Sequence, residues 1–423
     1  MTGGPLSGVR VVDLTMAWAG PMTTRVLAQL GADVTKVEAA GKMDRWRGGT
    51  FVQRGTERYP DHDPGERPWN RNAYFNTQNV NKRSLVIDLK SPEGHDIIID
   101  LIRRADVVTE NFAYGAMKRL GLDYASLAEI RPGLVMLSMP GFGSSGPERD
   151  YIAHGPTIEQ LAGNAYLQGY PDGPPLASGR LAWGDPVAGM TAAALLMIAL
   201  WRRHTTGAGG HIDLAQLEAG VLFNFDSILD GINGGTVATR RGTGHAVLSP
   251  HGTYRCAGED RWVAIACRDS TDWQRLREVV GADSIAGPEY DDLTARRDAA
   301  EHIDKVIGEW ARGMDATAAA QALQARDVPA SAVLSAADLL TDEQLRRRGY
   351  FLDITHPEAG RHRYAGLPWQ YRSGPAWWRD VRPAPSFGEH NAAVLAEIGI
   401  SPERISQLAD DGVIAAEPVQ QGD

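Results

Sequence analysis

Two side chains near the middle of the chain, Asp185 and His154, have types and surroundings that could carry chemistry. Asp185 lies in the stretch SGRLAWGDPVAGMTAA, directly before Pro186, where a long apolar segment begins. At that position it is expected to cap a helix, with its carboxylate accepting backbone N–H groups and the helix dipole favouring its ionised form. An ionised, oriented carboxylate is also what a nucleophile requires. The local sequence therefore fits a structural cap and a nucleophile alike.

His154 lies 31 residues earlier, in the stretch DYIAHGPTIEQLAG. A single histidine can be a structural residue or a general base, and the local sequence leaves both open. Glu159, in the same stretch, is expected to face solvent or to cap the helix that follows His154. No partner for His154 can be named from spacing alone.

Basic pairs occur in NVNKRS (79–84) and in YGAMKRLG (114–121). Each pair is either a solvated surface pair or a set of phosphate contacts for a nucleotide-bearing ligand, since Arg binds phosphate bidentately and Lys as a point charge. Other chemistries lack their motifs: the chain has no GxSxG, Walker A, HExxH or EF-hand sequence, and its 11 histidines are scattered without ligand spacing. We therefore predict no metal site.

Composition narrows the range of partners. The chain has 423 residues and a formal net charge of -10, which disfavours nucleic acids and anionic membranes as partners. No basic run followed by an apolar stretch opens the sequence, so no signal peptide is expected. The apolar segment 186–201 falls short of the roughly 20 residues of a membrane span and is predicted to be a buried helix. Two cysteines without CxxC spacing favour a reduced, cytoplasmic protein.

The elements that must position these side chains alternate between strand and helix. Helical spacing is found at 22–32 and 91–105, and the latter has Ser91 as its cap and Pro92 in its first turn. Short β-branched runs lie at 8–14, 33–38, 84–89, 106–112, 133–139 and 211–215. Alternating strands and helices predict an α/β fold with a parallel sheet. The first turn, TMAWAGPMT, lacks GxGxxG, which disfavours a nicotinamide cofactor.

A second domain is indicated where the composition changes, beyond about Phe225. The segment 231–252 is rich in glycine and polar residues, and 252–267 is typical of a hairpin that turns at 258–260. Helical segments follow. We therefore predict a large α/β domain at 1–225, a smaller α+β domain at 226–334, and a segment at 335–423 that links back to the large domain.

Several segments in this order resemble the class III CoA-transferase family of CaiB/BaiF type, the formyl-CoA and carnitine CoA-transferase group. The matching segments cover nearly the whole chain. They are PLSGVRVVDLTMAWAGPMTTRVLAQLGADVTKVE, YFNTQNVNKRSLVIDLKSPEG, ADVVTENFAYGAMKRLGLDY, GPPLASGRLAWGDPVAGMTAA, TTGAGGHIDLA and SFGEHNAAVLAEIGI. The resemblance implies a Rossmann-like large domain built from both chain ends, an inserted small domain and an interlocked homodimer.

The resemblance also assigns roles to residues. Asp185 takes the place of the family's catalytic aspartate, and Ala39 departs from the basic residue or proline often found after the second strand. A substrate pocket is expected at Trp183, Gly184 and His245, with Trp18 and Trp46 as further walls and His251 as a second histidine. The implied CoA-binding residues are Ala17, Trp18, Ile87, Asp88, Leu89, Lys90, Asn111, Phe112, Ala113, Arg119 and Leu120.

The implied reaction moves CoA from an acyl-CoA to a carboxylic acid through a covalent aspartyl-CoA thioester on Asp185. CoA is then a substrate, and no tightly bound cofactor is expected. One alternative is a 2-methylacyl-CoA racemase, because His154 matches the racemase histidine; Gly155 in place of that motif's aspartate counts against it. Another is a catalytically silent subunit of a hetero-oligomer, which the presence of Asp185 disfavours.

Overall fold

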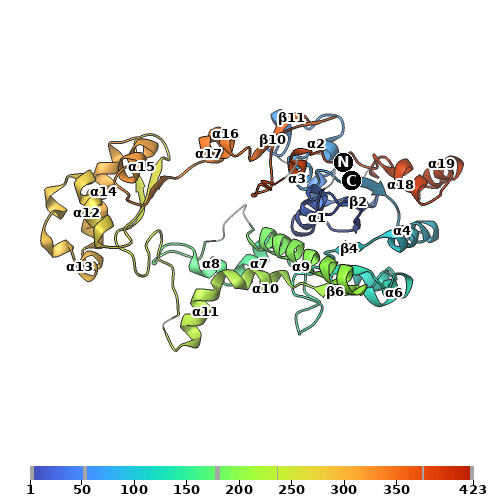
Figure 1. Ribbon diagram of the computed structural model, residues 1–423, viewed down its shortest axis with the longest axis horizontal. Coiled ribbons are helices and arrows are strands. Elements are labelled where there is room, and N and C mark those ends of the chain that lie inside the picture. The colour runs from blue at the N-terminus through green and yellow to red at the C-terminus, as the bar shows by residue number, and fades with distance from the viewer. Residues whose placement is uncertain (1–3, 51–54, 177–181, 236, 374–375, 420–423) are drawn as a thin grey trace. The chain divides into compact units, whose positions relative to one another are not determined.

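The computed structural model describes residues 4–50, 55–176, 182–235, 237–373 and 376–419. The backbone divides into a large unit within residues 1–164, 177–235 and 347–423, and a small unit within 165–176 and 236–346 (Figure 1). Both stretches that contain Asp185 and His154 belong to the large unit.

A six-stranded parallel sheet forms the centre of the large unit, in the order β3-β2-β1-β4-β5-β6. The predicted α/β class with a parallel sheet is confirmed, and the strand order is that of a doubly wound Rossmann sheet. Strands β4 and β5 are buried along their whole length, as expected for strands covered on both faces. The strands are β1 (Arg10–Asp13), β2 (Asp33–Glu38), β3 (Arg83–Val86), β4 (Val107–Glu110), β5 (Val135–Ser138) and β6 (Gly210–Asp213).

Helices cover both faces of this sheet, and neighbouring strand residues point to opposite sides. Val11 packs on the face covered by α1 (Ala19–Gln29) and α9 (Gly184–Thr206). Val12 packs on the other face, with α4 (Pro92–Arg104). Ser91 caps α4 as predicted, since its hydroxyl accepts the Gly94 N–H at 3.0 Å.

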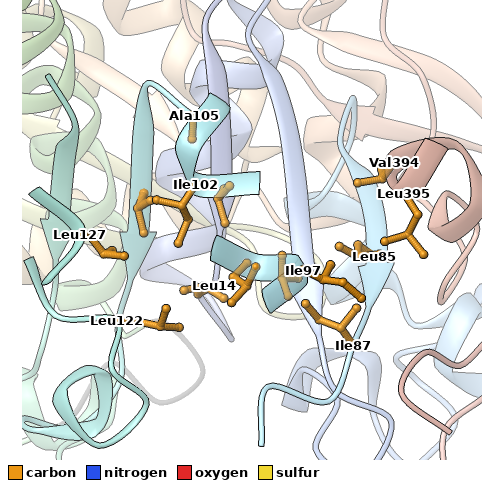
Figure 2. Close-up of a cluster of buried hydrophobic side chains, with 14 of the residues drawn as sticks. Leu14, Leu85, Ile87, Ile97, Ile102, Ala105, Leu122, Leu127, Val394 and Leu395 are labelled. Carbon is orange, nitrogen blue, oxygen red and sulfur yellow. The ribbon is translucent and has the colours of Figure 1, made fainter. Parts of the chain in front are cut away.

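The end of the chain contributes to the second of these cores. Val394 and Leu395, on α18 (Asn391–Glu397), lie beside Leu85 of β3, while Ile97 and Ile102 of α4 lie over the same sheet face (Figure 2). The other helices of the large unit are α2 (Pro68–Arg71), α3 (Ala73–Gln78), α5 (Ala116–Arg119), α6 (Tyr124–Ile130), α7 (Gly155–Leu161), α10 (Gln216–Val221), α11 (Phe225–Ile232) and α19 (Pro402–Asp410). A hairpin of β10 (Phe351–His356) and β11 (Gly360–Ala365) was not expected from the sequence.

Helix α9 is longer than the apolar segment from which it was predicted. It has 23 residues and is long and apolar enough to cross a membrane by length and composition alone. The prediction of a buried helix holds for one side only: Ala188, Ala192 and Leu196 are buried in the core beside α1, whereas Ile198 and Trp201 are exposed. Its start positions Asp185.

The small unit has its own core around Trp273, which is fully buried. The predicted hairpin is confirmed as β7 (His251–Arg255) and β8 (Trp262–Ala266), with β9 (Ala330–Ala332) added antiparallel to β8. Its helices are α12 (Ser270–Val280), α13 (Leu293–Asp298), α14 (Ala300–Arg312), α15 (Ala316–Gln324) and α16 (Ala336–Thr341). Helices α8 (Asn164–Leu167) and α17 (Glu343–Arg347) lie where the chain passes between the units.

Candidate active site

Asp185 lies in the first turn of α9 and does not cap it, contrary to the prediction. The N-cap is Trp183, which already has helical φ and ψ of -55° and -31° and makes no side-chain capping bond. Because the helix begins before Pro186, the Asp185 side chain is free to reach another element. Its carboxylate accepts a hydrogen bond from the backbone N–H of Ala19, the first residue of α1.

A third helix start meets the same carboxylate. Gly155 is the first residue of α7, and a Cβ atom built there would stand 2.0 Å from Asp185 Oδ2 and 2.3 Å from the Ala182 Cβ. No side chain larger than hydrogen fits in that space. Asp185 is therefore enclosed by the starts of α1, α7 and its own helix.

Enclosure changes the acidity of Asp185 in a direction opposite to the prediction. Burial raises its pKa from 3.8 to about 6, and the hydrogen bond from Ala19 opposes this shift without cancelling it. Removal of water from a carboxylate disfavours its charged form more than the helix dipole favours it here. Near neutral pH the group is still mostly ionised, but it is poorly hydrated, which suits a nucleophile.

The loop that leads into α1 is held in place by side chains from neighbouring strands. Asn111 binds the Met16 backbone twice, donating to its carbonyl and accepting from its N–H, both at 2.8 Å. Ala17 has a φ of 64°, and its N–H donates to Asp44 Oδ1 at 3.0 Å. The loops after β1 and β4 meet here at the switch point of the sheet, where ligands bind in doubly wound folds.

Buried ion pairs hold the loop between β1 and α1 in place. Lys36 Nζ lies 2.9 Å from Asp44 Oδ2 and donates to the Thr15 carbonyl at 2.7 Å. Lys82 Nζ pairs with Asp13 at 3.0 Å, both side chains are fully buried, and burial lowers the pKa of Lys82 to about 8. The sequence offered two interpretations of the basic pair Lys82–Arg83, a solvated surface pair or phosphate contacts. Both are wrong for Lys82, whose side chain is buried in an ion pair with Asp13.

Most of the implied CoA-binding residues follow the carboxyl ends of three strands of the sheet, β1, β3 and β4. Because parallel strands end at one edge of a sheet, the residues after β1, β3 and β4 lie along the same edge. The side chain of Ile87 is buried in the core, while Asp88 and Lys90 are exposed and joined by a 3.0 Å bond from the Lys90 N–H to Asp88 Oδ1. Arg119 ends α5 and is exposed.

The remaining members of this set lie beside those just described. Phe112 donates its N–H to Glu110 at 2.7 Å, Leu89 packs against the core, and the Leu120 carbonyl meets His95 Nε2 at 3.1 Å. Ala113 is exposed. All of these assignments stay predictions.

The pocket residues expected from the sequence separate into three groups. The rings of Trp18 and Trp46 lie 5.4 Å apart, whereas Trp183 is exposed and makes no ring contact among the described residues. The space beside Gly184 is taken by Ile158, whose Cγ2 would be 2.8 Å from a Cβ there. His245 belongs to the small unit, where its Nδ1 accepts the N–H groups of residues 247 and 248 at 3.1 Å.

His154 is exposed and has a partner that the sequence did not reveal. Arg45 Nη1 lies 3.4 Å from His154 Nε2. Tyr74 extends the pair of tryptophans, with its ring 5.1 Å from Trp46. The basic and aromatic composition of MDRWRGG (43–49) was the available clue to Arg45. No group of three or more His, Cys, Asp or Glu side chains suited to a metal ion is found among the described residues.

The chain is similar to known proteins over most of its length. The model of CoA-transferase family III matches residues 6–391. The chain is 30% identical to a formyl-CoA:oxalate CoA-transferase of Streptomyces avermitilis, over 97% of this chain and 99% of that protein. It is 32% identical to a succinate–glutarate CoA-transferase of Agrobacterium fabrum, over 93% of this chain and 96% of that protein.

A solved structure has the same fold over nearly the whole length. A CaiB/BaiF family protein from Brucella suis superposes with a TM-score of 0.82 at 28% identity, covering 94% of this chain and 100% of that one.

Proposed function

Because the chain belongs to CoA-transferase family III, we propose that it transfers CoA from an acyl-CoA to a carboxylic acid through a covalent intermediate on Asp185. The observation that carries this proposal is the enclosure of one desolvated carboxylate, with a pKa of about 6, by three helix starts. A carboxylate in that setting is mostly ionised at neutral pH and is not masked by water.

The donor half of the reaction forms the enzyme thioester. An Asp185 oxygen attacks the thioester carbonyl carbon, the C–S bond breaks, and CoA thiolate leaves behind a mixed anhydride. The thiolate then attacks the aspartyl carbonyl, which releases the donor acid as a carboxylate and leaves aspartyl-CoA. The Ala19 N–H, already bonded to the carboxylate, stabilises the oxyanions at this carbon.

The acceptor half reverses these two steps. The incoming carboxylate attacks the aspartyl thioester and expels CoA thiolate, giving a second mixed anhydride. The thiolate attacks the acceptor's carbonyl carbon, and the new acyl-CoA leaves with Asp185 restored as a carboxylate. Each difficult exchange is split into two acyl transfers, which is the advantage of covalent catalysis.

The geometry around His154 favours transfer over racemisation. A guanidinium donates hydrogen bonds and cannot accept them, so its contact with Nε2 requires the lone pair of that nitrogen. A racemase base needs a free lone pair to remove an α-proton. The carboxylate of Asp185 likewise argues against a catalytically silent subunit.

We further propose a homodimer in the cytoplasm. Large apolar side chains are exposed on α9 and α11 of the large unit, as expected of surfaces that a second subunit covers. They are Ile198, Trp201, Phe225, Ile228, Leu229 and Ile232. Cys256 and Cys267 are free thiols, in keeping with a reducing compartment.

Exchange of CoA between an acyl-CoA and a carboxylic acid, followed by mass spectrometry of the thioesters, tests the proposal. Asp185→Asn should lower turnover by roughly 10³-fold or more with the fold intact. Asp96→Asn, which changes an exposed carboxylate on α4, is the matched control and should keep full activity. Full exchange by Asp185→Asn would rule out the covalent mechanism.

A further inference from the structure

Arg45 has no role in the mechanism above, although it contacts the residue that precedes Gly155. It contacts His154 Nε2 at 3.4 Å, and His154 is followed directly by Gly155, against which Asp185 Oδ2 lies. The guanidinium is exposed, and no carboxylate lies within ion-pair distance of it among the described residues. Its charge is therefore available to a ligand.

The surroundings of Arg45 suit an anion that is partly removed from water. Trp46 follows it in the chain, and the row of rings formed by Trp18, Trp46 and Tyr74 provides an apolar wall in which the two tryptophans are half-buried and Tyr74 is exposed. An apolar wall strengthens the attraction between a guanidinium and an anion by excluding water from one side. One Nη of Arg45 is held by His154, which leaves the remaining N–H groups for a bidentate contact with a carboxylate.

We infer that Arg45 is a specificity residue that binds a second carboxylate of the acid, so that the enzyme prefers dicarboxylic acids to monocarboxylic ones. The inference rests on the proposed function, because it takes Asp185 as the position of the reacting carboxyl group. One carboxylate of the acid attacks the aspartyl thioester while the other binds Arg45. A monocarboxylic acid of the same length has no second carboxylate for Arg45, so the Arg45 side chain adds nothing to its affinity.

Binding can be tested without turnover. Glutarate and pentanoate, which have the same number of carbon atoms, are titrated into the full-length protein while tryptophan fluorescence is followed, because Trp18 and Trp46 lie beside the site. We expect glutarate to bind at least about tenfold more tightly than pentanoate, and Arg45→Gln to remove that difference. Equal binding of both acids by the wild type, or glutarate affinity unchanged in Arg45→Gln, would overturn the inference.

Kinetics separate this role from binding of CoA phosphates. With butyryl-CoA as the donor, Arg45→Gln should lower kcat/KM for glutarate by about tenfold or more while leaving that for pentanoate and the KM of butyryl-CoA within about twofold. Arg45→Lys should recover part of the loss. Arg58→Gln is the matched control, because Arg58 stacks on Tyr74 at 5.1 Å in the same row without contacting His154.

Results that contradict the role of Arg45 differ from results that contradict CoA transfer by this protein. A loss confined to the KM of butyryl-CoA, or an equal loss for both acids, would contradict the role of Arg45. Absence of CoA exchange with either acid in the wild type would count against the proposed function, and the fluorescence titration would still decide whether Arg45 binds dicarboxylates.

Discussion

The Oδ2 atom of Asp185 lies so close to Gly155 that a Cβ atom at residue 155 would stand only 2.0 Å away. The two residues come from the first turns of different helices, α9 and α7. Their contact removes water from one side of the carboxylate and fixes its position relative to Ala19. Glycine at 155 is thus a requirement of the site rather than of the backbone, since its φ is not in the left-handed region.

Substitution of Gly155 by alanine should therefore impair the reaction and also destabilise the fold, because the added Cβ meets the Ala182 Cβ as well as the Asp185 carboxylate. The added methyl group displaces the carboxylate, and a displacement on the order of 1 Å costs roughly 100-fold in rate. Steady-state kinetics and circular dichroism measure the two effects. Gly308→Ala, at a position in α14 with no other atom within 4 Å of the added Cβ, is the control and should leave activity unchanged. Normal activity in Gly155→Ala would show that Asp185 is not confined by this contact.

Asp185→Asn should stabilise the protein at alkaline pH. The folded pKa of about 6 exceeds the ordinary 3.8, so the folded state binds the proton more tightly than the unfolded state. The contribution of Asp185 to stability therefore falls as pH rises from about 4 to about 6. At pH 8 the ionised, desolvated carboxylate costs up to about 3 kcal/mol, which asparagine avoids.

Chemical unfolding at pH 4 and at pH 8 measures the free energy of unfolding of the wild type and of Asp185→Asn. The variant should be more stable than the wild type at pH 8 and nearly equal to it at pH 4. A variant that is less stable at pH 8 would mean that the carboxylate is better solvated or better bonded than we describe.

Asn111 should act on catalysis through the Met16 backbone. Asn111→Ala removes both 2.8 Å hydrogen bonds and releases the loop that presents the Ala19 N–H to Asp185. We expect kcat to fall by about tenfold to 100-fold. Asn111→Asp keeps the acceptor for the Met16 N–H but places an oxygen against its carbonyl, so it should not restore activity. A change in the KM of the acyl-CoA alone would assign Asn111 to ligand binding only.

Lys82 should be essential for stability and not for ligand binding. Lys82→Met leaves Asp13 as a buried carboxylate without its 3.0 Å partner, and loss of one member of a buried pair costs about 3–5 kcal/mol. Arg83→Met, which breaks ion pairs with the partly exposed Asp33 and Glu397, should cost less than about 1 kcal/mol. Urea unfolding of both variants measures this difference, and equal losses would contradict it.

Much of the large unit could be predicted from local sequence. The run at 133–139 became β5 because strands covered on both faces are largely apolar. The run at 33–38 became β2 although it is partly charged, since Lys36 and Glu38 are buried in ion pairs with Asp44 and Arg47. The strand order could not be predicted in this way, since it depends on which strands pair across the sheet. The β10–β11 hairpin was missed because its burial is partial and its sequence, FLDITH and GRHRYA, is largely polar.

Asp185 could be chosen as a candidate from the sequence, but its pKa and its tertiary contacts could not be predicted. Asp185 could be selected by resemblance, yet the direction of its pKa shift depends on burial against Gly155 and the start of α1, which lie far from it in the sequence. Lys82 was misinterpreted for the same reason, because its partner Asp13 is 69 residues away. Arg45 and His154, 109 residues apart, meet only through the tertiary fold.

The central claim is that Asp185 carries CoA as a thioester during turnover. The most direct measurement is to incubate the wild-type protein with an acyl-CoA that it turns over, trap with hydroxylamine or borohydride, and identify the modified residue by peptide mass spectrometry. We predict a hydroxamate or a homoserine at Asp185, dependent on the acyl-CoA and absent from Asp185→Asn. An unmodified Asp185 in a protein that exchanges CoA, or an adduct on another residue, would contradict the mechanism.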